Sequence, residues 1–176
     1  MTKTNHKKNK KMKKQEITMI AAIQNDRGIG YQGDLIHSIK NDMKHFIEQT
    51  TNHTVIMGRK NWESIPEKYR PFKNRENIII SRDNNYHAPG AIIVPTIEEA
   101  IKQSTKQKIY IIGGGQIYTL GLPYADSLDI THIDAHAPAD IFFPEFKDLF
   151  TLDQKSEKIH DTETNLDYEF QIWKRK

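Results

Sequence analysis

The sequence contains no cysteine, which excludes disulfide bonds and metal sites built on thiolates. It also has no apolar run of membrane-spanning length, and its N-terminus has too many lysines and no apolar centre for a secretory signal. Neither an internal repeat nor an interdomain linker interrupts the 176 residues. These absences predict a protein with one folded domain that works in the cytoplasm.

Charge is unevenly distributed along the chain. The formal net charge is +3, but residues 1–16 alone hold seven lysines and one acid, Glu16, which gives +6. Subtracting +6 from +3 leaves −3 for the rest. We therefore expect a basic, disordered N-terminal extension over residues 1–16 and a folded domain over residues 17–176. The extension can bind nucleic acid or an anionic surface, can be a solvated segment without a role, or can reflect a true start at Met12. The last two readings are favoured, because charged runs seldom fold or specify a partner alone.

Apolar runs predict strands that alternate with helices. Runs typical of strands buried on both faces occupy residues 17–23, 54–57, 77–81, 91–94, 108–112 and 127–134. Helices are predicted after residue 38, around Trp62, after the capping box Thr96–Glu99, and after Gly115, with Ile117 and Leu120 facing inward. Two alternating segments, residues 151–159 and 167–173, predict an antiparallel hairpin. The order predicts an α/β sandwich around a mostly parallel sheet.

The predicted helix after residue 38 contains an acid in an unusual place. Ser38 is the expected N-cap, and three glycines before it predict a mobile loop over residues 28–33. The apolar positions repeat with helical spacing and predict the inward face: Ile39, Met43, Phe46 and Ile47. Asp42 borders that face, so its carboxylate must find partners or its pKa rises. It is either a structural acid stabilised by the helix N-terminus or a functional carboxylate.

Glycines and cations follow several predicted strands. The glycines at residues 113–115 come between a strand and a helix, where backbone can approach a phosphate, although a tight turn explains them equally. Arg59 and Lys60 follow Gly58 in the same way, and Arg82 follows another strand. Cations at the carboxyl ends of parallel strands are typical of a phosphate site, with scattered surface charges as the alternative.

Three polar residues alternate on one predicted strand, namely His132, Asp134 and His136. They share a face and imitate a metal site, but the sequence offers no evident fourth ligand. Solvent-facing residues at the end of a strand are the favoured reading, and no metal is expected.

Residues 17–176 resemble bacterial dihydrofolate reductase along nearly their whole length. The matching stretches are ITMIAAI, DRGIG, the helix with Asp42 and Phe46, VIMGRKNWESIP, RENIIIS, IIGGGQIY and DITHIDA, in the family's order and spacing. The resemblance implies a three-layer α/β sandwich with a central eight-stranded, mostly parallel sheet and an antiparallel C-terminal strand. It also implies NADPH-dependent reduction of 7,8-dihydrofolate to 5,6,7,8-tetrahydrofolate, which supplies one-carbon units for thymidylate, purine and amino-acid synthesis.

The resemblance also implies a substrate site. Asp42 is its expected catalytic residue, which hydrogen-bonds the pterin 2-amino group and ring N3 with support from Thr131, while the proton reaches N5 through water. Arg75 is expected to pair with the α-carboxylate of the folate glutamate. The implied substrate-binding residues are Ile20, Ala22, Asp42, Met43, Phe46, Ile65, Phe72, Arg75, Ile112 and Thr131.

The implied cofactor is NADPH rather than NADH, because Arg59, Lys60 and Arg82 match positions around the adenosine 2′-phosphate. Gly113-Gly114 match a glycine pair joined by a cis peptide, and Tyr118 is placed near the nicotinamide. The implied cofactor-binding residues are Ala22, Ile29, Gly30, Leu35, Gly58, Arg59, Lys60, Asn61, Ser81, Arg82, Ile112, Gly113, Gly114, Gly115, Gln116, Ile117 and Tyr118. Dihydrofolate and NADPH are the expected small-molecule partners of a monomer. No membrane partner is expected, and nucleic acid is considered only for the basic extension.

The chain departs from the family in three places. Leu35-Ile36-His37 stands for the usual Leu-Pro-Trp, whose tryptophan helps to hold a water beside the pterin. Asn61 replaces a threonine, and Ala139 replaces a glycine before Asp140. Two other functions remain open at this point. One is a reductase of the same fold that acts on a pyrimidine intermediate of riboflavin synthesis, against which Asp42 and Arg75 argue; the other is a homologue that binds ligand or nucleic acid without turnover.

Overall fold

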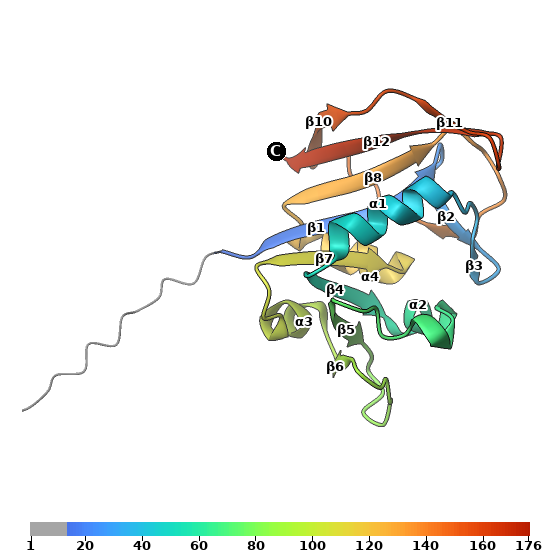
Figure 1. Ribbon diagram of the computed structural model, residues 1–176. Coiled ribbons are helices and arrows are strands. Elements are labelled where there is room, and N and C mark those ends of the chain that lie inside the picture. The colour runs from blue at the N-terminus through green and yellow to red at the C-terminus, as the bar shows by residue number, and fades with distance from the viewer. Residues whose placement is uncertain (1–13) are drawn as a thin grey trace, which may run out of the picture.

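A mostly parallel sheet organises residues 14–176, the part of the chain that the computed structural model describes (Figure 1). Its strands are β1 (Glu16–Gln24), β4 (Thr54–Gly58), β5 (Glu76–Ile80), β6 (Ile92–Val94), β7 (Lys108–Gly113), β8 (Ser127–Ile133), β10 (Phe150–Lys155), β11 (Ile159–Asp161) and β12 (Leu166–Arg175). Eight of them follow the order β10–β12–β8–β1–β7–β4–β5–β6, and β11 pairs with β12. The six from β8 to β6 are parallel, whereas β12 and β10 are antiparallel. The expected mostly parallel sheet with an antiparallel C-terminal strand is confirmed.

The parallel strands owe their positions to continuous apolar sequence. Every residue of β4 is buried, and Met19 of β1 and Ile111 of β7 are completely buried at the centre. Strands covered on both faces need apolar side chains at every position, because neither face meets water. The apolar runs predicted these six strands to within one residue at each end.

Four helices cover the two faces of the sheet, α1 (Lys40–Thr50), α2 (Arg59–Ser64), α3 (Ile97–Gln103) and α4 (Gly115–Gly121), and two short 3₁₀ turns, η1 (Glu67–Tyr69) and η2 (Leu122–Tyr124), follow α2 and α4. Ile97 of α3 and Ile117 of α4 pack with Met19 and Ile111 in one apolar cluster. Trp62 of α2 and Phe46 of α1 belong to a second cluster with Ile20. Figure 1 shows α1 across one face and α4 behind the sheet, which confirms the three-layer sandwich.

A small second sheet contains the segment that was expected to be a mobile loop. Strands β2 (Gly28–Tyr31), β3 (Asp34–Leu35) and β9 (Ile141–Phe142) pair antiparallel in the order β3–β2–β9. The loop prediction is wrong because the pairing partner, β9, comes from a distant part of the chain, which local sequence does not reveal. The Asp26 carboxylate steadies the entry by accepting a hydrogen bond of 2.9 Å from the Gly28 amide.

The expected start of α1 is also corrected. Ile39, not Ser38, occupies the N-cap position, and no side chain caps this end. Met43 and Ile47 are 48% and 47% exposed, so the apolar stripe of α1 is only partly covered. By contrast the Thr96 cap of α3 is confirmed, because its hydroxyl accepts a hydrogen bond of 3.1 Å from the Glu99 amide.

The remaining predictions concern α4 and the chain ends. Leu120 was expected to face inward and is 45% exposed; Ile117, Tyr118 and Gly121 are the buried residues of α4. The C-terminal hairpin is confirmed, since β10 and β11 both pair antiparallel with β12. Most of the expected basic extension lies outside the described residues, although β1 already begins at Glu16. Within residues 14–176 no helix has the length and apolar character needed to cross a bilayer.

Candidate functional site

The carboxyl ends of two neighbouring parallel strands, β4 and β7, bring together the glycine turns predicted to hold the cofactor. Strand β4 ends at Gly58 and passes directly into α2, and β7 ends at Gly113 and passes through Gly114 into α4. Ligands of open α/β sheets bind outside this edge, because the turns there present backbone and helix starts to the same crevice.

Asp42 lies in the first turn of α1 and faces strand β8. Its Oδ1 accepts a hydrogen bond of 2.6 Å from the hydroxyl of Thr131, which is 2% exposed. Burial raises the pKa of Asp42 above its ordinary value, and the Thr131 hydrogen bond and the nearby His45 charge lower it by less. The second carboxylate oxygen is not used by Thr131. Asp42 therefore presents an oriented acceptor that is suited to N–H groups of a planar heterocycle.

Apolar side chains that were predicted to line the substrate site gather beside α1. Phe46 of α1 and Phe72 meet edge to face, with ring centroids 5.7 Å apart. Five predicted substrate-site residues share one apolar cluster, namely Ile20, Phe46, Ile65, Phe72 and Ile112. Met43 remains exposed beside Asp42, and Ala22 packs against a neighbouring cluster with Ile39 and Tyr168.

Arg75 is held at the C-terminal end of α1. Its Nε donates to the Thr50 hydroxyl at 3.1 Å, and its two other nitrogens donate to the carbonyls of Lys73 at 2.8 Å and Ile47 at 3.4 Å. A guanidinium has five N–H donors, so two remain, one on each terminal nitrogen. This pair of donors fits a carboxylate, as expected for Arg75.

Glycines keep the turns after β4 and β7 close to α4. A side-chain carbon on Gly58 would lie 2.8 Å from Cγ1 of Ile117, whereas one on Gly114 would meet nothing within 4 Å. The peptide between Gly113 and Gly114 is cis, as the resemblance implied. Tyr118 of α4 is buried and donates its hydroxyl to the Ile20 carbonyl at 2.7 Å, which ties α4 to β1. The turn at Gly114 therefore has free space beside its α-carbon, whereas the helix that follows it is held against β1.

Two side chains join the starts of α2 and α4 to their surroundings. Asn61 of α2 donates to the Ile112 carbonyl at 3.3 Å, so it links the two predicted cofactor turns despite replacing a threonine. A side-chain carbon on Gly115 would lie 2.8 Å from Cγ2 of Ile141, which places β9 against the start of α4. Other predicted cofactor residues surround these turns: Ile29 and Gly30 in β2, the exposed Leu35 in β3, and the exposed Gln116 in α4.

Arg59 is already engaged by acids. Its guanidinium lies 3.5 Å from the carboxylate of Glu63 and 3.5 Å from that of Asp83, and it stacks over the Tyr86 ring at 5.3 Å. Lys60 follows Arg59 in the sequence, Arg82 precedes Asp83, and both cations are exposed. The Ser81 hydroxyl accepts a hydrogen bond of 3.2 Å from the Asp83 amide. A phosphate at this point must compete with two carboxylates for Arg59.

His37, which stands in place of the family's tryptophan, is tied to strand β1. Its Nε2 lies 3.0 Å from Oε1 of Gln24, a fully buried residue whose amide nitrogen donates to Asp26 and to the Ala137 carbonyl. Because Oε1 only accepts, His37 carries its proton on Nε2. Burial lowers the pKa of His37 below its ordinary value of 6.5, so the ring is neutral at pH 7.

We expect His37→Trp to raise the rate of the hydride transfer that the resemblance implies, because indole fills more of the loop and can hold a water. Because burial lowers the pKa of His37, the change should remove less pH dependence between about 6 and 7 than the loss of an unperturbed histidine would. Single-turnover rates with normal and deuterated NADPH over this range measure both effects. A pH step in this range that disappears with the tryptophan would show that His37 is charged there.

A pair of charged residues beside Asp42 was missed by the sequence analysis. His45, one turn after Asp42 on α1, places Nε2 2.9 Å from both carboxylate oxygens of Asp129 on β8. Asp129 is 2% exposed. An acid inside the apolar strand SLDITHI, two residues before Thr131 and so on the same face, was the available signal.

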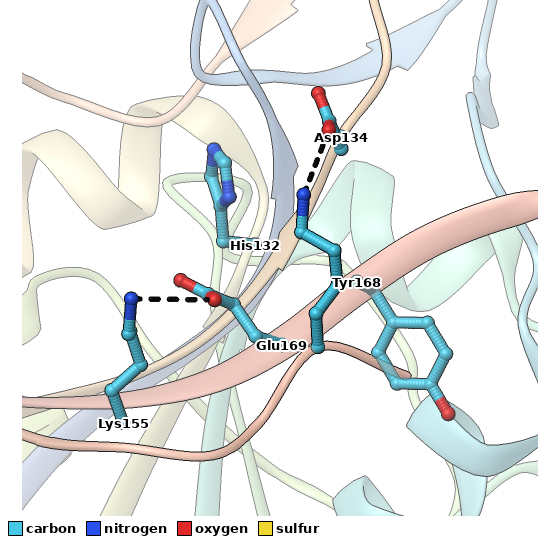
Figure 2. A pocket seen from close by; sticks show the side chains of 6 residues that line it. His132, Asp134, Lys155, Tyr168 and Glu169 are labelled. Atoms are coloured by element: carbon cyan, nitrogen blue, oxygen red, sulfur yellow. Dashed lines mark hydrogen bonds and ion pairs between the residues drawn. The ribbon is translucent and has the colours of Figure 1, made fainter. Parts of the chain in front are cut away.

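The opposite face of β8 carries a separate polar hollow of about 250 Å³ (Figure 2). Lys158 lies 3.1 Å from Asp134, and Lys155 lies 3.7 Å from Glu169, so the charges lining it cancel in pairs around His132. His136 faces Asp26 at 3.7 Å instead. Asp134 and His136 thus have separate partners, and the described residues contain no group of three ligands arranged for a metal.

A half-buried carboxylate together with glycine turns and cations at the carboxyl ends of parallel strands is typical of α/β enzymes that bind a phosphate-bearing cofactor. A model of the dihydrofolate reductase family matches residues 16–175. The dihydrofolate reductase of Bacillus subtilis is 34% identical over 162 residues, 91% of this chain and 95% of that protein. That of Buchnera aphidicola is 42% identical (74% and 80% covered), and that of Mycobacterium tuberculosis is 41% identical (64% and 68% covered).

The chain belongs to the dihydrofolate reductase family. It is an oxidoreductase that reduces dihydrofolate to tetrahydrofolate, and NADPH is the family's cofactor.

Proposed function

We propose that Asp42 is the residue through which this chain binds and activates the pterin ring of 7,8-dihydrofolate. The observation that carries this role is the 2.6 Å hydrogen bond from the buried Thr131 hydroxyl, which fixes one carboxylate oxygen and does not use the other. Two acceptor oxygens match the two adjacent N–H donors of the pterin, its 2-amino group and N3. Ile20, Phe46 and Ile112 supply apolar surface for the ring, and Arg75 supplies two donors for the glutamate tail.

The cofactor turns fit NADPH by their chemistry. Gly114 leaves open space where any other residue would project a side chain, and Asn61 joins this turn to α2. Arg59, Lys60 and Arg82 provide the cations that a 2′-phosphate needs. When bound, NADPH supplies the hydride that reduces the pterin.

The chain's own contribution is orientation and charge. Asp42 anchors the ring, and its negative charge favours proton uptake by the bound pterin, with water as the immediate donor to N5. Tyr118 holds α4 against β1 through the Ile20 carbonyl. The proposed cofactor turn at the start of α4 therefore keeps a fixed distance from Ile20 in the proposed pterin site. The Oε1 atom of Gln24 accepts hydrogen bonds from His37 and from the Ala137 amide, so Gln24 links these two segments.

Loss of NADPH absorbance with and without dihydrofolate tests this function. Consumption that requires dihydrofolate supports it. Consumption that instead requires the pyrimidine intermediate of riboflavin synthesis, or no consumption despite binding of both ligands, would reject it.

We also infer a cytoplasmic monomer that needs no nucleic acid. Asp42 and Thr131 contact each other within one chain, which supports a pterin site formed inside a single copy. A sedimentation mass near 20.5 kDa supports this state, and a dimeric mass would contradict it.

Removal of residues 1–11, so that the chain starts at Met12, should leave the kinetics of dihydrofolate reduction unchanged. Lys14 lies 3.7 Å from Asp126 and Gln15 donates to the Ser104 carbonyl at 3.1 Å, so the truncation keeps both contacts at the edge away from Asp42. Salt-sensitive retention on heparin should fall, because five lysines are lost. A large change in KM would instead show that the extension reaches the site.

A further inference from the structure

Two rungs of polar contacts connect α1 to β8 at the proposed pterin site. Asp42 meets Thr131, and one turn further His45 meets Asp129. Positions three apart on a helix are neighbours, and alternate residues of a strand share a face, so the rungs lie side by side. The first rung binds substrate in the proposed function, whereas the second has no role there.

The second rung is too deeply placed to be a surface ion pair. The Asp129 side chain is 3% exposed and that of His45 is 18% exposed. The imidazole stacks on Phe170 of β12, with ring centroids 4.4 Å apart, which fixes its plane. Both Asp129 oxygens lie 2.9 Å from the same nitrogen, so the carboxylate depends on His45 for compensation.

We propose that His45, held as an imidazolium by Asp129, is a positioning residue that sets the protonation state of Asp42. The proposal rests on the proposed role of Asp42 at the pterin. It assigns opposite effects to the two partners: the His45 charge favours ionised Asp42, and the Asp129 charge disfavours it.

The groups around the His45–Asp129 pair support these opposite effects on Asp42. Burial lowers the pKa of His45, but the hydrogen bond and charge of Asp129, with Asp42 and Glu48, raise it above 6.5 overall. His45 therefore keeps its charge to a higher pH than a free histidine does, while burial raises the pKa of Asp42 above its ordinary value. The other titratable groups nearby are Tyr110 of β7 and Tyr118 of α4, whose pKa values burial and these acids raise, so both remain neutral.

The titration midpoint of Asp42 can be measured without any ligand. In protein labelled with ¹³C-aspartate, the Asp42 carboxyl signal is the one that disappears in Asp42→Asn. His45→Gln keeps a donor to Asp129 but removes the positive charge, so we expect the midpoint to rise by about 1 pH unit. The double variant His45→Gln/Asp129→Asn removes both charges, and its midpoint should return most of the way to that of the wild type.

Lys44→Gln is the matched control. Lys44 precedes His45 on α1, but its side chain is 72% exposed and pairs with Glu48 across 3.9 Å, so solvent screens its charge. Its loss should move the Asp42 midpoint by less than about 0.2 units.

The proposal is overturned if His45→Gln leaves the midpoint unchanged, or if the double variant is displaced as far as the single one. Should His45→Gln fail to fold, the wild-type imidazole signal of His45 decides, because a midpoint below 6.5 would show that Asp129 does not keep it charged. These results are independent of turnover. A wild-type protein that fails to reduce dihydrofolate refutes the proposed function and leaves the charge coupling to be judged by the titrations.

Discussion

Asp42→Asn is expected to lower turnover of dihydrofolate by about two to four decades, the usual contribution of a positioned acid or base. Asparagine keeps the shape of aspartate and can still accept the Thr131 hydroxyl. It has no charge to favour protonation of the pterin, and its amide nitrogen would meet the pterin's donors with another donor. The loss belongs to the transition state, so kcat should fall more than NADPH affinity.

Steady-state kinetics between about pH 5 and 9, with NADPH binding measured separately, check this expectation. Asp153→Asn, at an exposed position in β10, is the matched control and should behave as the wild type. Near-normal turnover by Asp42→Asn at pH 7 would remove Asp42 from the mechanism.

The same substitution should stabilise the fold at neutral pH. Because burial raises the pKa of Asp42, folding favours the protonated acid, and this contribution is present below pH 3.8 and lost as pH rises through the folded-state pKa. Asparagine avoids that loss, so its thermal midpoint should exceed that of the wild type at pH 7, by about 2–4 °C for each kcal/mol. The advantage should vanish below pH 3.8. Lower stability at pH 7 would show that the charged form is well compensated.

Arg59→Ala is expected to weaken NADPH by about one to two decades and NADH by far less. Only NADPH carries the 2′-phosphate, and one charge-assisted contact is worth about 1.5–3 kcal/mol. Competition from Glu63 and Asp83, each 3.5 Å from the guanidinium, places the effect toward the lower end. Dissociation constants of both cofactors measure it.

Asp83→Asn provides the opposing variant. It removes one competitor and keeps the size of the side chain, so NADPH should bind a few-fold more tightly while NADH changes little. Equal weakening of both cofactors by Arg59→Ala would place Arg59 away from the 2′-phosphate.

Sequence predicted the sheet well because its strands are buried on both faces and so read as continuous apolar runs. It predicted α1 less well. Met43 and Ile47 have the spacing of core residues, but they are exposed beside the proposed pterin site. Periodicity does not distinguish a face that packs on the core from one that lines an open site, because both are apolar.

Distant contacts account for most of the other misses. Strand β2 finds its partner in β9, and His45 finds Asp129 across the α1–β8 interface, and neither pairing has a local signature. Arg59 was correctly recognised as a cation at a strand end. Its two acidic neighbours became visible only with the folded geometry.

Both ends of the described residues lie at the amino ends of the parallel strands, opposite the glycine turns of the proposed cofactor site (Figure 1). The parallel strand β1 starts there at Glu16, and the antiparallel strand β12 finishes there, where the Arg175 amide bonds the Asp126 carbonyl. A fluorophore, surface anchor or fusion partner joined at either end is therefore held at the amino ends of the parallel strands, away from the turns at Gly58 and Gly113. The fold thus offers two attachment points at which the enzyme can be immobilised with its proposed cofactor turns facing solution.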